Sequence, residues 1–180
     1  MKTTFEKLKA ELLLKAKNND ACQSGYSQAE ICETEKELLQ VIADNFNWVW
    51  QTKTITIEDL NKFDSDLLQS AGIFVNYKGS IKSDLGKLII LGTSYPRIET
   101  YDSRSPRIET YNSSSPIIAT YDSSSPRIAT YDSSSPIIAT HDSSSPRISG
   151  IENCIISKNL SLIIDLGNKA IIKSENWTVK

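Results

Sequence analysis

The stretch from Tyr121 to Gly150, YDSSSPRIATYDSSSPIIATHDSSSPRISG, writes almost the same ten residues three times. The unit reads P-(R/I)-I-(E/A)-T-Y-D-S-S-S from Tyr95 onward, and the six prolines lie ten residues apart between Pro96 and Pro146. Ile, Thr and Tyr suit a pleated strand, whereas Asp-Ser-Ser suits a turn. Proline is tolerated at the first residue of a strand, where its missing N–H does least harm. Each repeat therefore predicts a short strand and a turn, and not a disordered Ser/Pro tract, which would lack apolar residues.

An isoleucine recurs at steps of eight residues on both sides of the decapeptides, and at most of these steps it belongs to a hydrophobic doublet. The steps lead forward from Arg147 to Ile155, Ile163 and Ile171, and back from Arg97 to Ile89, Ile81 and Ile73. One such unit cannot bury an apolar face alone, but stacked units can. We therefore predict an α+β chain with a helical cap domain at residues 1–72 and a β-solenoid (β-helix) of 8- and 10-residue units at 73–180. The regular decapeptides occupy residues 95–149.

The residue after each proline alternates between two types, and the series is Arg107, Ile117, Arg127, Ile137, Arg147. A 20-residue period indicates two units per coil, although recent duplication would leave the same pattern. A triangular coil of three units and an antiparallel meander are the alternatives. Side chains alternate between the faces of a strand, so the second isoleucine and the Thr of each unit should point inward. The inward isoleucines are Ile98, Ile108, Ile118, Ile128, Ile138 and Ile148.

The N-terminal part has the periodicity and capping signals of three or four short helices. Polar pairs at capping-box spacing begin at Thr3, Ser27, Thr34 and Thr56, and the last of these helices should run to about Gln69 and end at Gly72. Trp48 and Trp50 are expected in the helical core. Such a cap would cover the open edge of the solenoid, whose unpaired backbone groups are otherwise a template for aggregation.

Composition excludes several classes of function. The formal net charge is −2, with 20 basic and 22 acidic residues, which argues against generic binding of nucleic acid or of membrane surfaces. Lys7, Lys9 and Glu11 interrupt the first apolar segment and no membrane-spanning run occurs, so we expect a cytoplasmic protein without a signal peptide. The three cysteines have no CxxC spacing and His141 is the only histidine, so we expect thiols at least half buried and no metal site.

Enzymatic chemistry has no support in the sequence. His141 occupies a position that is tyrosine in the neighbouring repeats, and the aspartates recur because the turn recurs. No G-x-S-x-G elbow, phosphate-binding loop or dinucleotide-binding motif is present, so we expect no catalytic residue and no cofactor.

Two outward faces are the candidate sites. The first carries Ile117, Tyr121, Ile137 and His141, extended by Tyr101, Ile155 and Ile171. An apolar face of this kind predicts a protein partner, which it would bind or inhibit, or a homodimer. The second face carries Arg107, Tyr111, Arg127, Tyr131 and Arg147. This Arg/Tyr ladder would hold a repetitive anionic polymer, either polysaccharide or nucleic acid, by charge and stacking.

The two faces allow two other interpretations. Outward Arg and Tyr side chains can simply solvate and stiffen a sheet through cross-strand pairs. Ice binding needs outward threonines on a flat surface of small residues, whereas the Thr of each unit here is expected to point inward.

The layout resembles a group of uncharacterised bacterial and phage-associated proteins with a short helical head and an eight- to ten-residue-repeat β-solenoid tail. The resemblance rests on a D-N-F-x-W-like stretch, here Asp44 to Trp48, and on the repeats themselves. It implies a solenoid and no established activity. A phage-borne interaction module of this type would be expected to act on host machinery.

Overall fold

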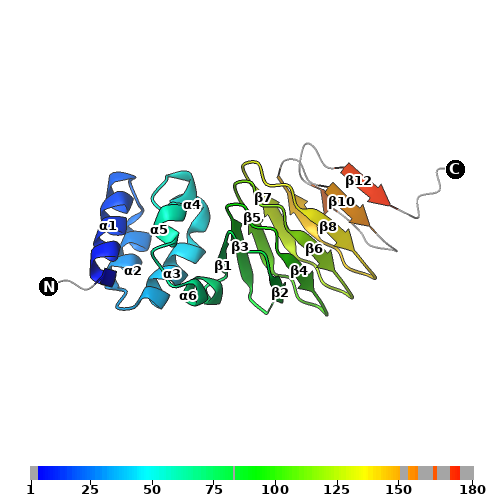
Figure 1. Ribbon diagram of the computed structural model, residues 1–180, viewed down its shortest axis with the longest axis horizontal. Coiled ribbons are helices and arrows are strands. Elements are labelled where there is room, and N and C mark those ends of the chain that lie inside the picture. The colour runs from blue at the N-terminus through cyan, green and yellow to red at the C-terminus, as the bar shows by residue number, and fades with distance from the viewer. Residues whose placement is uncertain (1–3, 83, 151–153, 158–163, 166–170, 175–180) are drawn as a thin grey trace. The chain divides into compact units, whose positions relative to one another are not determined.

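The computed structural model (Figure 1) describes residues 4–82, 84–150, 154–157, 164, 165 and 171–174, with side chains up to Gly150. The chain divides into two compact units, Met1–Ile73 and Phe74–Lys180. The first unit is helical and the second is built from parallel strands, so the α+β class and the β-solenoid are confirmed.

The helical unit contains more and shorter helices than the sequence predicts: α1 (Thr4–Asn18), α2 (Gln23–Ile31), α3 (Glu35–Asp44), α4 (Phe46–Gln51), α5 (Ile57–Leu60) and α6 (Ser65–Ser70). The capping boxes at Thr34 and Thr56 are confirmed as the starts of α3 and α5. The expected single last helix is wrong, because Asp64 caps a separate α6 by accepting bonds from the N–H groups of Asp66 and Leu67.

The start of α2 was also predicted wrongly. Ser27 lies inside this helix, and the cap is Cys22, whose Sγ accepts a bond from the Gly25 N–H at 3.4 Å. The sequence predicts the helix start at Ser27 because serine is a preferred capping residue and a thiol is not. The capping box predicted at Thr3 falls outside the described residues.

The helical core is apolar, and at one side a buried carboxylate forms an ion pair with a partly exposed lysine. Phe46 and Trp50 stack at 5.8 Å and are both buried, as predicted for Trp50, whereas Trp48 stays half exposed. Lys15 of α1 pairs with the buried Asp59 of α5 at 2.7 Å. Burial would raise the pKa of the Asp59 carboxyl, but the bonds from Lys15 and Thr56 outweigh it and lower that pKa. The pair joins α1 to α5.

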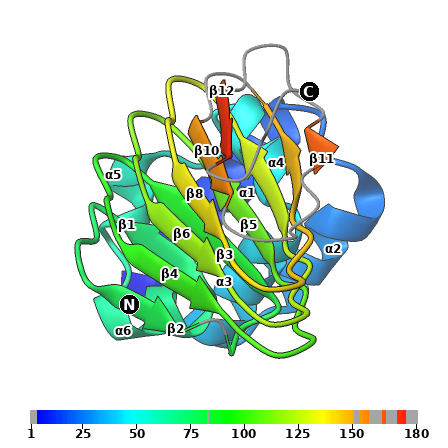
Figure 2. The same ribbon diagram turned by 90° about the vertical axis from the view of Figure 1, so that its right-hand side faces the viewer.

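The solenoid unit has strands at nearly regular intervals: β1 (Ile73–Val75), β2 (Ser80–Lys82), β3 (Lys87–Leu91), β4 (Arg97–Thr100), β5 (Arg107–Thr110), β6 (Ile117–Thr120), β7 (Arg127–Thr130), β8 (Ile137–Thr140), β9 (Arg147–Ser149), β10 (Cys154–Ser157), β11 (Ile164–Asp165) and β12 (Ile171–Ser174). Odd strands form sheet A in the order β1-β3-β5-β7-β9-β11, and even strands form sheet B in the order β12-β10-β8-β6-β4-β2. The two sheets lie opposite one another in Figure 2.

Each coil therefore contributes one strand to each sheet. In sheet A, Arg107 pairs with Arg127 and Arg127 with Arg147, and in sheet B Ile117 pairs with Ile137, all in parallel register. The prediction of two units per coil is confirmed, and the triangular coil and the antiparallel meander are excluded for these strands. The alternation of Arg and Ile thus sorts the two residue types onto different sheets.

The interior is a double layer of isoleucine bordered by hydroxyl groups. The six isoleucines predicted to point inward are all at most 1% exposed, and they form one cluster with Phe74, Ile81, Leu88 and Ile90. The repeat threonines are also inward, as predicted, which removes the outward threonines that ice binding needs. Thr100 Oγ1 bonds to Ser124 Oγ at 3.0 Å, and Thr120 Oγ1 bonds to Ser144 Oγ at 2.8 Å. The buried hydroxyls thereby satisfy one another between coils.

The turns form a second ladder of bonds along the coil axis. Asp102, Asp122 and Asp142 each adopt a left-handed backbone with φ between 53° and 60°, a conformation that Asp tolerates better than most residues. The Asp122 carboxylate accepts a bond from the Asp102 N–H at 3.1 Å, and Asp142 accepts one from the Asp122 N–H at 3.2 Å. Each turn thus bonds to the equivalent turn of the next coil, which explains why the same turn sequence recurs.

The eight-residue steps outside the decapeptides were assigned to the wrong phase. Cys154, not Ile155, pairs with Ile137, while Ile155 pairs with the inward Ile138. Ile171 pairs with Cys154 and so has the same register as Ile137, as predicted for the apolar face. Ile163 lies outside the described residues. One coil here spans seventeen residues instead of sixteen, and a slip of one residue turns a strand over. On the N-terminal side, Ile81 is also off by one residue and aligns with the inward Ile98, whereas Ile89 is off by two residues and aligns with Glu109.

Candidate binding surfaces

The outward face of sheet B carries a strip of apolar side chains across β4, β6 and β8. We call it the apolar strip, and its members are Tyr101, Ile117, Ala119, Tyr121, Ile137, Ala139 and His141. Ile117 and Ile137 are paired in register and are 43% and 42% exposed, which is high for isoleucine. Ala119 and Ala139 are the next outward residues of the two strands, and their small side chains do not protrude beyond the isoleucines.

Stacked rings form one border of the apolar strip. Tyr101 and Tyr121 stack at 5.0 Å between centroids, and Tyr121 and His141 stack at 4.6 Å, both nearly parallel. Tyr121 and His141 are half buried by this stacking. The four residues predicted for the apolar face, Ile117, Tyr121, Ile137 and His141, therefore do lie together. The predicted extension through Ile155 is wrong, because the register of Ile155 is that of the inward Ile138.

The strip ends at a charged pair on β4. Arg97 Nε donates to Glu99 Oε1 at 2.7 Å, and the Tyr101 hydroxyl donates to Glu99 Oε2 at 2.5 Å. The bond to Glu99 raises the pKa of Tyr101 to about 12, so this phenol is neutral at ordinary pH. Across β4, β6 and β8, the charged outward side chains thus lie on β4, the rung that precedes Ile117.

Sheet A presents a column of arginines in the corresponding position, and its first rung is neutralised. Arg107 Nε donates to Glu109 at 2.5 Å, Lys87 Nζ lies 3.4 Å from the same carboxylate, and the Tyr111 hydroxyl donates to it at 3.2 Å. Glu109 is fully buried by these groups. These three groups thereby compensate the buried negative charge of Glu109, which would otherwise be costly to remove from water.

Tyr111 does not face solvent as the sequence predicts. It is 1% exposed, because it stacks on Tyr131 at 4.6 Å and its hydroxyl turns to Glu109. Burial, followed by the negative charge of Glu109, raises the pKa of Tyr111 above its usual range. Of the five residues predicted for the Arg/Tyr ladder, Arg107, Arg127 and Arg147 are exposed and Tyr131 is half buried.

The next two rungs of sheet A have no such neutralisation. Ala129 and Ser149 occupy the position of Glu109, so the strands that carry Arg127 and Arg147 offer no carboxylate. Within the part of the chain that the structure describes, neither guanidinium has an ion pair or a hydrogen bond. The two arginines and Arg107 border a shallow hollow of about 290 Å³ that also touches Tyr131 and Ser149. We call this set the arginine hollow.

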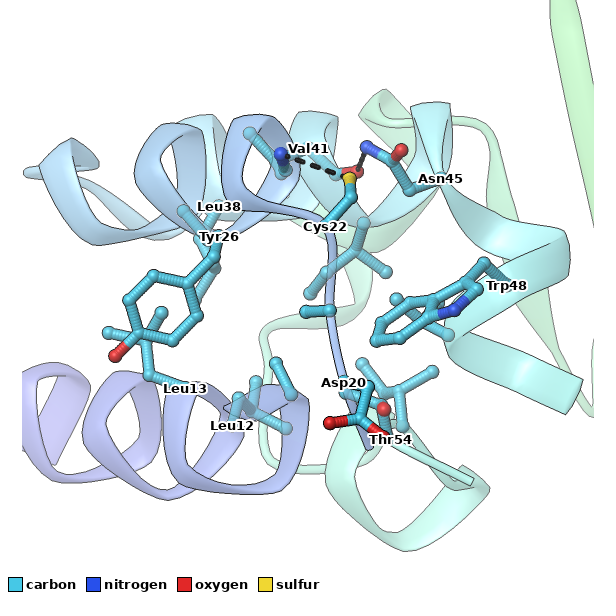
Figure 3. Close-up of a pocket in the computed structure, with 17 residues that line it drawn as sticks. Leu12, Leu13, Asp20, Cys22, Tyr26, Leu38, Val41, Asn45, Trp48 and Thr54 are labelled. Atoms are coloured by element: carbon cyan, nitrogen blue, oxygen red, sulfur yellow. Dashed lines mark hydrogen bonds between the residues drawn. The ribbon is translucent and has the colours of Figure 1, made fainter. Parts of the chain in front are cut away.

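A third candidate surface, a groove, lies in the helical unit, where the sequence predicted only core packing. A largely apolar groove of about 340 Å³ opens among α1, α2, α3 and α4 (Figure 3). The one signal for it is that α2 has no fully buried residue, although its neighbours supply an apolar floor.

Other kinds of site are not found in the described residues. No three His, Cys, Asp or Glu side chains among them gather in a way that could hold a metal ion, and none of their helices is long and apolar enough to cross a membrane. Cys22 is exposed, against expectation, because it caps α2 at the surface, whereas Cys32 is buried.

Comparisons with the models of known families, with curated proteins and with solved structures give no match to this chain, so its function has to be inferred from its own surfaces.

Proposed function

We propose that this chain is a non-catalytic interaction module and that the apolar strip of sheet B binds a protein surface, with a second copy of the chain as its simplest occupant. The observation that carries the proposal is the pair of exposed isoleucines, Ile117 and Ile137, fixed side by side in register. Covering the 43% and 42% of these side chains that are still exposed would contribute about 0.6–1.3 kcal/mol each, a proportionate share of the full burial of an isoleucine.

The form of the strip also favours a protein partner. A sheet face held by bonds between coils loses little freedom on binding, so less of the interaction energy is spent on ordering. Stacked aromatic rings beside small alanines give a flat surface with apolar and polar edges, and aromatic residues are enriched in protein interfaces. Two such strips can meet face to face across a two-fold axis, since each is the same surface.

The test uses substitutions that the repeat itself already contains. Arg97 precedes Ile117 and Ile137 in the same column of sheet B, so Ile117→Arg with Ile137→Arg should keep the coil. We expect the wild-type chain to be dimeric by light scattering at high concentration and the double variant to be monomeric. The matched control, Arg127→Ser with Arg147→Ser on sheet A, creates no second pair of exposed isoleucines and should leave the dimer intact. A dimer that survives the sheet B substitutions, or a wild-type chain that stays monomeric, would contradict self-association through the strip.

The arginine hollow supports a second candidate function, the binding of a repetitive anionic polymer. Two exposed guanidinium groups without carboxylate partners repel each other, and an anion placed between them would relieve the repulsion. Coil spacing of about 4.8 Å repeats this arrangement along the sheet, which suits a linear ligand. The guanidinium is also the side chain best shaped for sulfate, phosphate or carboxylate groups.

This second function is tested with heparin as the anionic probe in the full-length chain. We expect binding that weakens with salt, and Arg127→Ile with Arg147→Ile should lower the slope of log affinity against log salt by about 2 if each arginine contacts one anionic group. Arg97→Ile is the control, because Arg97 is exposed but already paired with Glu99 at 2.7 Å. Equal losses for each arginine removed in the two variants would show that general charge, not the hollow, holds the polymer.

A further inference from the structure

The groove of the helical unit has the size and lining of a ligand site. Its floor is formed by Leu12, Leu38, Ile42, Val49 and Ile55, which are all at most 8% exposed in the fold yet border the cavity. A volume of about 340 Å³ lies within the usual range for small-molecule sites. At the roughly 30 Å³ that a water molecule occupies in the liquid, the groove has room for about ten non-hydrogen atoms.

The rim of the groove offers one carboxylate and an amide oxygen as hydrogen-bond acceptors. Asp20 is the only lining residue with a formal charge at neutral pH, and its carboxylate has no partner among the described residues. Asn45 Nδ2 donates one of its two N–H groups to the Val41 carbonyl at 2.9 Å, and its Oδ1 can accept a hydrogen bond. Thr54 Oγ1 already accepts from Asn19 Nδ2 at 2.9 Å. No lysine or arginine lines the groove.

Two aromatic rings complete the walls. Figure 3 shows the rings of Tyr26 and Trp48 on opposite sides, with the Tyr26 hydroxyl and the Trp48 nitrogen turned away from the centre. Ring faces attract cations, most strongly those of Trp and Tyr. A ligand for this groove should therefore have an apolar body and a head that donates hydrogen bonds and carries positive charge.

We propose that the groove binds a small apolar amine in its ammonium form, with the hydrocarbon body on the leucine and isoleucine floor and the ammonium at Asp20. A carboxylate or phosphate head would meet Asp20 with the wrong sign and would find no basic lining residue. This site is separate from both solenoid surfaces and does not depend on their function.

The experiment compares three probes with the same alkyl chain by titration calorimetry on the full-length chain: octylammonium, 1-octanol and octanoate. We expect octylammonium to bind roughly twofold to fivefold more tightly than 1-octanol, the range of an exposed ion pair, and octanoate to bind most weakly. Asp20→Asn should bring octylammonium down to the affinity of 1-octanol. Asn tolerates the left-handed backbone of Asp20, where φ is 57°, so this change removes the charge and keeps the turn.

Two further variants separate binding from folding. Glu58→Gln removes an exposed carboxylate elsewhere in the helical unit and should leave all three affinities unchanged. Ala16→Phe places a ring in the groove and should abolish binding of all three probes while helical circular dichroism is retained. The proposal is overturned if octanoate binds as tightly as octylammonium, if Asp20→Asn leaves their ratio unchanged, or if no probe gives saturable binding to the wild-type chain.

Discussion

The repeat is maintained at single positions by bonds that link one coil to the next. The turn aspartate shows this most clearly, because it combines a left-handed backbone with a carboxylate that accepts from the turn one coil earlier. Asn112 fills the same position, and its Oδ1 accepts from the Gly92 N–H at 3.3 Å. Asp and Asn in the decapeptide turns therefore suit the backbone and can accept the bond, whereas Gly92, which fills this position one coil earlier with φ at 70°, only donates it.

This account makes a prediction for Asp122. Asp122→Asn should cost little, since Asn keeps both the backbone conformation and an acceptor. Asp122→Ala should lower the free energy of unfolding by about 1–3 kcal/mol, because it adds left-handed strain and leaves the Asp102 N–H without its acceptor. Asp122→Gly should fall between them, as it removes the strain alone. Urea unfolding would measure the three changes, and equal stability of the Ala and Asn variants would be inconsistent with the turn ladder.

At the scale of strands and helices, the sequence predicted what repetition makes visible. The ten-residue spacing from Pro96 to Pro146 predicted the decapeptide strands and their inward isoleucines. The alternation of Arg and Ile predicted that these two residue types lie on different sheets. The doublet Ile155-Ile156 could not be phased in the same way, since either isoleucine can face inward and only the length of the coil decides. Tyr111 was placed outside for lack of any sequence signal that Glu109 would be buried beside it. The groove escaped notice because α2 covers its neighbours incompletely, a tertiary feature.

Insertion of whole repeats tests the two-strand coil at this scale. A duplicate of residues 117–136 adds one strand to each sheet, so the apolar strip should lengthen and the dimer should persist. A duplicate of residues 127–136 alone moves every later strand to the opposite sheet and separates Ile117 from Ile137. Both variants keep the inward isoleucines and should fold, as circular dichroism would check. Only the shorter insertion should weaken the dimer, and an equal effect of both would argue against the coil.

As a whole, the solenoid offers two surfaces of different chemistry on opposite sheets. The apolar strip belongs to sheet B and the arginine hollow to sheet A, so occupation of one leaves the other exposed. We therefore expect saturating short heparin fragments to leave the mass of the dimer unchanged apart from the bound ligand. Dissociation of the dimer by heparin in light scattering would mean that the two functions share a surface.

The central claim is that neighbours along a sheet are twenty residues apart, while residues ten apart lie on opposite sheets. Spin labels on cysteines introduced at positions 117 and 137 test this directly, with Cys22, Cys32 and Cys154 replaced by serine. Adjacent rungs lie about 4.8 Å apart, so we predict strong dipolar broadening for this pair and much weaker broadening for labels at 127 and 137. Broadening that is equal in the two pairs, or stronger at 127 and 137, would contradict the two-strand coil and with it both surfaces.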